Sequence, residues 1–214
     1  MLVEVLPVGP LQANCYLVAD DATRRALIID PGDEAEQILA RLRRLDLIPE
    51  AIVATHGHFD HIGAIRAVRE TTGVPFLALE EEREMLEAAP GRAQIFGFFV
   101  DPPPPADRWL HDGDTITAGG LTFRVVHAPG HSPGHLILLG ATGAFVGDVI
   151  FAGSVGRTDL PGGDSAQLFA SIARHVLPLP DETVLYPGHG PITSVGRERA
   201  TNPFVLMLTR PGPS

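Results

Sequence analysis

Short apolar runs separated by turns dominate the first part of the chain, and each has the length of a strand. The turn Asp30-Pro-Gly32 ends the third of these runs. The predicted strands are Leu2–Leu6, Cys15–Ala19, Ala26–Ile29, Ala51–Thr55 and Val74–Leu79. Uninterrupted apolar runs of this kind are typical of strands that are buried on both faces.

Amphipathic segments lie between these runs and predict helices. Asp33, followed by Glu36 three residues later, predicts a capping box at the start of the first helix. A second helix is predicted over Ile62–Thr72, and a third over Glu80–Ala88, whose acidic start suits the positive end of a helix dipole. The apolar stripe of the first helix consists of Ile38, Leu39, Leu42 and Leu45.

The second half of the chain repeats this alternation. A helix is predicted to begin at Ser165, which caps it. The predicted strands are Asp114–Thr117, Leu121–Val126, Leu136–Leu139, Ala144–Val146 and Thr183–Tyr186. Two sets of strands, each followed by helices, predict an α/β (α+β) fold in which two sheets pack face to face with helices outside. No linker divides the halves, so we expect one domain over residues 1–214.

The segment Pro90–Pro105 has the least regular pattern and is predicted to be a loop. It contains Phe96, Phe98 and Phe99 among several prolines and glycines. Two interpretations stay open: a surface loop with a small apolar cluster, or a flap over a pocket.

Composition restricts the class of function. The net charge of −10 argues against a nucleic-acid partner, because neutralising phosphates requires a basic face. No run approaches the roughly 18 apolar residues of a membrane span. The start, Met1–Pro7, lacks the features of a signal peptide, and the single cysteine, Cys15, rules out an internal disulfide. We therefore expect a cytoplasmic protein without a membrane partner.

Metal-ligand side chains gather directly after the predicted strand Ala51–Thr55. His56 and His58 alternate along extended chain and so can share one ion, while Asp60 and His61 can face a second. Imidazoles with few carboxylates suit zinc, iron or manganese better than magnesium or calcium.

Three later side chains have the same context, because each follows a predicted strand and lies beside glycine or proline. They are His131, Asp148 and His189. Ends of strands are where α/β scaffolds gather functional groups, so we expect these residues to join the first cluster. His127 and His135 flank His131 and are candidates for hydrogen bonds to ligands, with simple packing as the alternative.

The segment Thr55-His-x-His-x-Asp-His61, with Pro129-Gly-His131, Gly147-Asp148 and Pro187-Gly-His189, resembles the metallo-β-lactamase superfamily, most closely its glyoxalase II-like (hydroxyacylglutathione hydrolase-like) branch. The resemblance implies a four-layer αββα sandwich. It also implies one ion on His56, His58 and His131, a second on Asp60, His61 and His189, and Asp148 bridging the two.

Two divalent ions about 3.5–4 Å apart can hold a hydroxide at neutral pH. We expect these ions to be zinc, with iron or manganese as the alternatives. We expect this hydroxide, held through Asp60 and Asp148, to attack the carbonyl of a small-molecule thioester. Export and a metal-binding cysteine are typical of true β-lactamases, whereas this chain has Asp148 at the corresponding position.

Departures from the family pattern concern the substrate. Full-length glyoxalase II enzymes continue with a helical domain that contacts glutathione, and the short stretch after His189 predicts that this domain is absent. Arg157 is the candidate for binding a substrate carboxylate and Asp159 for orienting it; the alternative is a structural pair. The rival functions are a mononuclear-iron persulfide dioxygenase, using residues that match His56, His131 and Asp148, and a metal-binding scaffold without turnover. The oligomeric state is not predicted.

Overall fold

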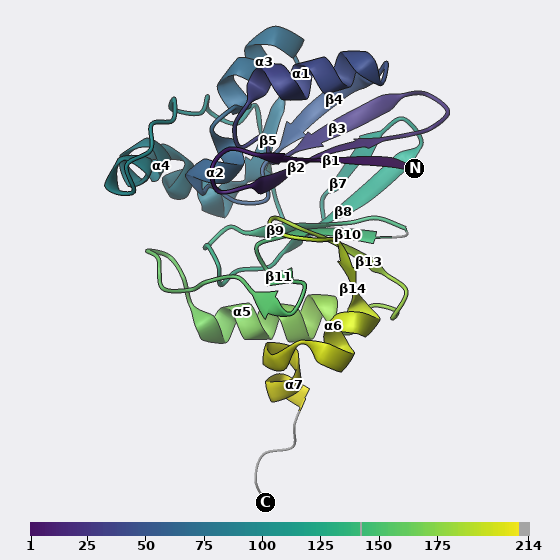
Figure 1. Cartoon of the computed structure of the whole chain (residues 1–214), viewed down its shortest axis with the longest axis vertical. Coiled ribbons are helices and arrows are strands. Elements are labelled where there is room, and N and C mark those ends of the chain that lie inside the picture. The colour runs from purple at the N-terminus through teal and green to yellow at the C-terminus, as the bar shows by residue number, and fades with distance from the viewer. Residues whose placement is uncertain (142, 210–214) are drawn as a thin grey trace, which may run out of the picture.

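The computed structural model describes residues 1–141 and 143–209, and its elements form four layers: helices, sheet, sheet, helices (Figure 1). The first sheet has the strand order β1-β2-β3-β4-β5-β6, antiparallel as far as β3 and parallel from there. Its strands are Leu2–Val8, Ala13–Ala19, Arg25–Ile29, Ile48–Val53, Phe76–Leu79 and Arg108–Leu110. This sheet includes all five strands that the first half of the sequence predicts.

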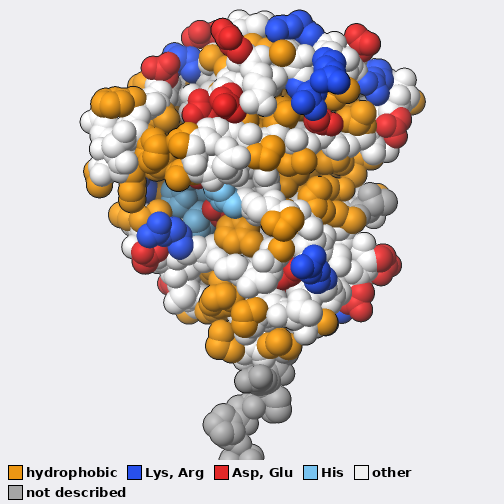
Figure 2. All heavy atoms as spheres, in the orientation of Figure 1, with side chains coloured by type: hydrophobic (Ala, Val, Ile, Leu, Met, Phe, Trp, Pro, Cys, Tyr) orange, Lys and Arg blue, Asp and Glu red, His pale blue; other side chains and the backbone are white. Residues whose placement is uncertain are grey.

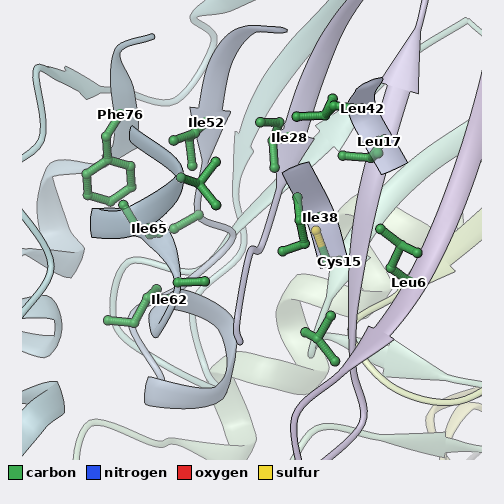
Figure 3. Close-up of a cluster of buried hydrophobic side chains, with 14 of the residues drawn as sticks. Leu6, Cys15, Leu17, Ile28, Ile38, Leu42, Ile52, Ile62, Ile65 and Phe76 are labelled. Atoms are coloured by element: carbon green, nitrogen blue, oxygen red, sulfur yellow. The ribbon is translucent and has the colours of Figure 1, made fainter. Parts of the chain in front are cut away.

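Helices α1 (Ala35–Arg44) and α3 (Ile65–Thr72) cover the outer face of the first sheet. Their apolar stripes bury Ile38 and Ile65 against strand residues such as Ile52 in one continuous core (Figure 3). β2 is buried along its whole length because this helical layer covers one face and the second sheet covers the other.

The second sheet has the strand order β14-β13-β10-β9-β8-β7, and only β10 and β13 pair parallel. Its strands in chain order are Thr115–Ala118, Leu121–His127, Leu136–Leu139, Gly143–Gly147, Val184–Pro187 and Thr193–Ser194, and a hairpin of β11 (Ile150–Phe151) and β12 (Ser154–Val155) lies beside it. Between the sheets, a core containing Phe123 and Phe145 joins the two halves.

Three helices and a π-helical turn cover the outer face of the second sheet. They are α5 (Ser165–Ser171), the turn at Ile172–Val176, α6 (Val195–Thr201) and α7 (Pro203–Thr209). Leu168, Val195 and Val205 pack from these helices onto the sheet. The predicted αββα sandwich is therefore confirmed.

Two helix starts differ from the prediction. The helix predicted over Ile62–Thr72 is two helices, α2 (Phe59–Ile62) and α3, separated at Gly63 and Ala64. The predicted capping box is wrong: residue Glu34 precedes α1 with φ 53° and no side-chain cap. The side chain of Asp33 instead accepts from the Glu34 N–H at 2.6 Å.

The loop prediction for Pro90–Pro105 is wrong for its first residues. After a 3₁₀ turn at Glu80–Glu82, helix α4 runs from Arg83 to Ile95 and includes Pro90. Ala93, which lies beyond the point where the proline would end the helix, is fully buried, so packing favours its continuation.

In the part of the chain that the structure describes, none of the helices has the length and apolar character needed to cross a membrane.

Candidate metal centre

The candidate ligands converge at one edge of the sandwich, where four strands end. The segment from His56 to His61 follows β4 and continues into α2. His131 follows β8, Asp148 follows β10 and His189 follows β13, so the second sheet contributes the other ligands. Residues up to 133 positions apart thus meet at the edge where the two sheets face each other.

His56, His58 and His131 form the first group. The Nε2 atom of His131 lies 3.2 Å from His56 Nε2 and 2.9 Å from His58 Nδ1, and the last two atoms lie 3.1 Å apart. Nitrogen ligands about 2.0–2.1 Å from a tetrahedral zinc ion lie about 3.3 Å from one another, so this triangle has nearly the required size.

Asp60, His61 and His189 form the second group. His189 Nε2 lies 3.2 Å from His61 Nε2 and 3.2 Å from Asp60 Oδ2, while Asp60 Oδ2 and His61 Nε2 are 3.7 Å apart. One carboxylate and two imidazoles at these distances can hold one divalent ion.

Asp148 lies between the two groups. Its Oδ2 atom is 3.4 Å from His131 Nε2, and its Oδ1 atom is 3.6 Å from His61 Nε2. Among the residues that the structure describes, Oδ1 of Asp148 is buried without a hydrogen-bond partner. A buried carboxylate whose two oxygens lie near both groups, one of them without a hydrogen-bond partner, fits a ligand shared by two cations, so the residues present fit a pair of metal ions.

Hydrogen bonds behind the ligands fix which ring nitrogen faces the centre. Asp30 accepts from the hydroxyl of Thr55 at 2.7 Å, which leaves that hydroxyl oxygen to accept from His56 Nδ1 at 3.0 Å. Asp30 also accepts from His61 Nδ1 at 3.1 Å, and the carbonyl of Arg157 accepts from His131 Nδ1 at 2.8 Å. These contacts leave the Nε2 lone pairs of the three imidazoles aimed at the centre.

Asp30 is the main contributor that sequence reasoning missed. It is buried, has φ 51°, and also accepts from the Thr55 N–H at 2.6 Å. Asp30, His56 and His61 also have ligand atoms close enough to one another to hold an ion. The hydrogen bonds to Thr55 and His61 already engage both oxygens of Asp30, which makes it a support for ligands.

Burial and nearby charges shift the pKa values of the imidazoles in opposite directions in the two groups. Burial, helped by the neighbouring His131, lowers the pKa of His58 to about 3, and burial likewise keeps the pKa of His56 well below its usual value. Burial opposes a charge on His61 as well, but Asp148, Asp60 and Asp30 outweigh it and raise the pKa of His61 to about 10. Without a bound ion, the first group therefore presents neutral imidazoles, whereas the carboxylates around the second group favour a second proton on His61, which a metal ion would displace from Nε2.

Two glycines allow the strand ends to approach this closely. A Cβ atom at Gly188 would lie 2.1 Å from Asp148 Oδ1. Gly147 has φ 46°, and a Cβ atom there would lie 2.6 Å from the Thr55 hydroxyl oxygen. Any larger side chain would displace Asp148 or the residues that support His56.

A buried carboxylate, Glu82, joins the two loops that carry the first group. It accepts from the Gly57 N–H at 3.0 Å, the Gly134 N–H at 2.5 Å and the Ser132 hydroxyl at 3.1 Å. Burial raises the pKa of Glu82 to about 7 despite these hydrogen bonds.

The two flanking histidines have different roles. His135 Nε2 accepts from the backbone N–H of Asp148 at 3.0 Å, so the predicted contact with a ligand residue holds for His135. His127 Nε2 donates to the carbonyl of Pro133 at 2.7 Å and so braces the loop after His131.

A pocket of about 660 Å³ opens above the ligands. Figure 2 shows histidine side chains at the bottom of a hollow bordered by hydrophobic side chains. Arg157 lines this pocket, whereas Asp159 is not among its lining residues. Two hydrogen bonds of 2.7 Å join the Arg157 guanidinium to the Asp159 carboxylate.

The four layers and the paired His/Asp groups at the strand ends define an αββα metallohydrolase. A family model of the metallo-beta-lactamase superfamily matches residues 8–189, and the chain belongs to this superfamily. The resemblance inferred from the His/Asp motifs is therefore confirmed.

Individual relatives differ in what they are called. The chain is 41% identical over 210 residues to the hydroxyacylglutathione hydrolase GloC of Haemophilus influenzae, covering 96% of this chain and 98% of that protein. The crystal structure of BLEG-1 B3 metallo-beta-lactamase is 43% identical with a TM-score of 0.90, covering 95% of this chain and 99% of that one. The crystal structure of TTHA1623 in a di-iron-bound form is 44% identical with a TM-score of 0.88, covering 94% of this chain and 100% of that one.

Proposed function

We propose that this protein is a binuclear metallohydrolase of thioesters. The observation that carries the proposal is the arrangement of two ligand triads around Asp148 at the bottom of a large pocket. In this proposal His56, His58 and His131 would hold one divalent ion, Asp60, His61 and His189 would hold the other, and Asp148 would be a ligand of both. When bound, such ions lower the pKa of water toward about 7 and act as Lewis acids on a carbonyl oxygen.

The chain supplies the remaining requirements of thioester hydrolysis. Asp60 and Asp148 would hold the ions, whose positive charge would then face the oxyanion that develops at the carbonyl, and the pocket has room for the thioester beside them. Attack of the oxygen of water forms a C–O bond, and expulsion of the thiolate breaks the C–S bond. The products are a carboxylate, a thiolate and the two protons of the water, which pass to solvent. Because a thiol has a pKa of about 8.5, the thiolate leaves without protonation by a dedicated acid. The similarity to GloC supports a thioester as the substrate.

Metal analysis with activity assays tests this proposal. Protein purified without added metal should contain two divalent ions per chain, with zinc as the expected metal. It should also hydrolyse the thioesters of several thiols. Asp148→Ala should lose one or both ions and reduce kcat/KM at least about 100-fold, as expected when a ligand is removed. Asp101→Ala, which removes an exposed carboxylate away from the ligand triads, is the matched control.

Three results would overturn the proposal. One iron per chain with O₂ uptake on a persulfide would assign a dioxygenase. Hydrolysis of β-lactams with inert thioesters would place the chain with the β-lactamases. An Asp148→Ala variant that keeps both metals and full activity would refute the ligand assignment.

A further inference from the structure

The pocket above the ligands has walls of a distinct chemical kind. Apart from the ligands it is lined mainly by apolar side chains, contributed on one side by α4 with the segment after it and on the other by the β11–β12 hairpin with the loop that follows β12. The largest of these side chains are Phe59, Ile95, Phe96, Phe98, Phe151 and Leu160. A volume of about 660 Å³ is in the range of sites that enclose a whole small molecule.

The aromatic side of the pocket remains partly open to solvent. The ring of Phe59 lies 5.4 Å from that of Phe98 and 6.1 Å from that of Phe96. Phe96 is 50% exposed and Ile95 is 81% exposed. Exposed apolar side chains at the mouth of a pocket are stabilised when an apolar ligand removes them from water.

Two cations line the pocket, and they differ in their partners. The Arg157 guanidinium is engaged by Asp159 through two hydrogen bonds, so its charge is compensated. Arg92 of α4 contacts the sulfur of Met85 and, at 3.5 Å, the carbonyl of Pro161 across the pocket. Over residues 1–141 and 143–209, no carboxylate lies within 4.0 Å of Arg92; its charge acts on Glu82 only at longer range.

Of the two guanidiniums that line the pocket in the described residues, Arg92 is the half-buried one without a salt bridge. The acidic residues that line the pocket are Asp60 and Asp148, and both belong to the ligand groups. Burying a charge without a partner is unfavourable, and a guanidinium binds a carboxylate better than any other anchor of its size. The geometry around Arg92 is therefore that of a binding site for an anion on the ligand.

We propose that the pocket takes an anionic thioester with a bulky apolar acyl group, and that Arg92 binds the anion while Phe59, Phe96 and Phe98 bind the acyl group. This inference rests on the proposed thioester hydrolysis. In this proposal α4 and the segment after it determine the substrate specificity. Arg157 does not bind the anion, because it pairs with Asp159.

A matched pair of thioesters tests the anion. The 4-phenylbutanoyl thioesters of 3-mercaptopropionate and of its neutral amide differ only in the charge. The metal-loaded protein should prefer the acid at least about tenfold in kcat/KM, mainly through KM, as a charge-assisted hydrogen bond predicts. Arg92→Leu should abolish the preference and Arg92→Lys should keep part of it. Arg43→Leu, which removes the same charge from the exposed face of α1, should keep all of it.

A second comparison tests the apolar wall. With 3-mercaptopropionate as the thiol, the protein should prefer the 4-phenylbutanoyl over the acetyl thioester. Phe96→Ala and Phe98→Ala should reduce that preference several-fold, whereas Phe99→Ala, at an exposed ring that does not line the pocket, should keep it. Equal rates on both acyl groups in the unmodified protein would overturn the assignment of the wall.

Binding of an inert analogue separates this inference from the proposed function. The thioethers formed from 4-phenylbutyl groups and the same two thiols cannot be hydrolysed, and calorimetry gives their Kd values directly. Tighter binding of the acid in the unmodified protein, lost in Arg92→Leu, supports the anion site even where no thioester is turned over. A preference for the acid that survives in Arg92→Leu would assign the anion to the metals and overturn the role of Arg92, as would equal binding of both thioethers.

Discussion

At the scale of single residues, the sequence reveals the candidate ligands more readily than the residues that hold them in place. The ligand positions were predictable because histidines and aspartates follow strand ends beside glycine or proline, and the structure brings all seven together. Asp30 was not predictable, since an aspartate before Pro31 and Gly32 is also what an ordinary turn contains. Only the fold shows that its carboxylate meets Thr55 and His61.

Glu82 illustrates the same limit and gives a direct prediction. Glu80, Glu81 and Glu82 form one acidic run, yet only Glu82 is buried and accepts three hydrogen bonds from the ligand loops. Glu82→Gln places an amide N–H₂ group against these donors, so we expect a loss of about 1–3 kcal/mol in the free energy of unfolding. Urea denaturation of the metal-free protein measures this loss. Glu81→Gln, at the exposed neighbouring position, is the control and should change stability little.

The loss of unfolding free energy in Glu82→Gln should also depend on pH. Burial raises the pKa of Glu82 from 4.5 to about 7, with Arg92 as the charged group that partly opposes the shift. The folded protein therefore holds this proton more tightly than the unfolded chain, and the stability that it contributes is complete below pH 4.5 and is lost as the pH rises to about 7. Glutamine has no such proton, so the penalty of Glu82→Gln should be larger at pH 5 than at pH 8. A penalty that grows toward pH 8 would contradict the burial argument.

At the scale of elements, helix boundaries were harder to predict than strands. Apolar runs mark the strands because most of them are buried on both faces, whereas a helix start depends on local backbone geometry that several sequences share. The split between α2 and α3 follows from such geometry, because a Cβ atom at Gly63 would lie 2.4 Å from the Gly32 carbonyl. This contact cannot be predicted from the pattern of apolar positions in the sequence.

Helix α4 gives a prediction at this scale. Pro90 lies inside the helix, where its missing N–H leaves the turn before it without one hydrogen bond. Pro90→Ala should therefore stabilise the protein by about 1 kcal/mol or more, measured by thermal and urea unfolding. Pro103→Ala is the matched control in the irregular segment after α4, and it should instead reduce stability by up to about 1 kcal/mol, because a flexible residue raises the entropy of the unfolded chain. Destabilisation by Pro90→Ala would show that the ring packs in a way that an alanine cannot replace.

At the scale of the whole molecule, the layer order was predictable and the contents of the pocket were not. Two sets of strands with helices between them permit few arrangements other than two covered sheets. The pocket walls, in contrast, combine α4 with the β11–β12 hairpin and the loop after β12, segments that local sequence patterns cannot bring together. The substrate therefore depends on long-range contacts, while the metal motif depends on strand ends.

The same long-range arrangement predicts how metal removal affects stability. The ligands come from both sheets, so bound ions would join β4 and α2 of the first half to β8, β10 and β13 of the second. The unfolded chain separates these ligands and binds metal weakly, so each ion at 1,000 times its Kd should add about 4 kcal/mol to the free energy of unfolding. For a chain of this length, chelation should therefore lower the Tm by about 10 °C for each ion removed, measured by scanning calorimetry. His58→Ala should reduce the difference, because the first group then keeps only His56 and His131. An equal Tm with and without chelator would mean that the two sheets hold this edge together without metal, and that the ligand cluster contributes to chemistry alone.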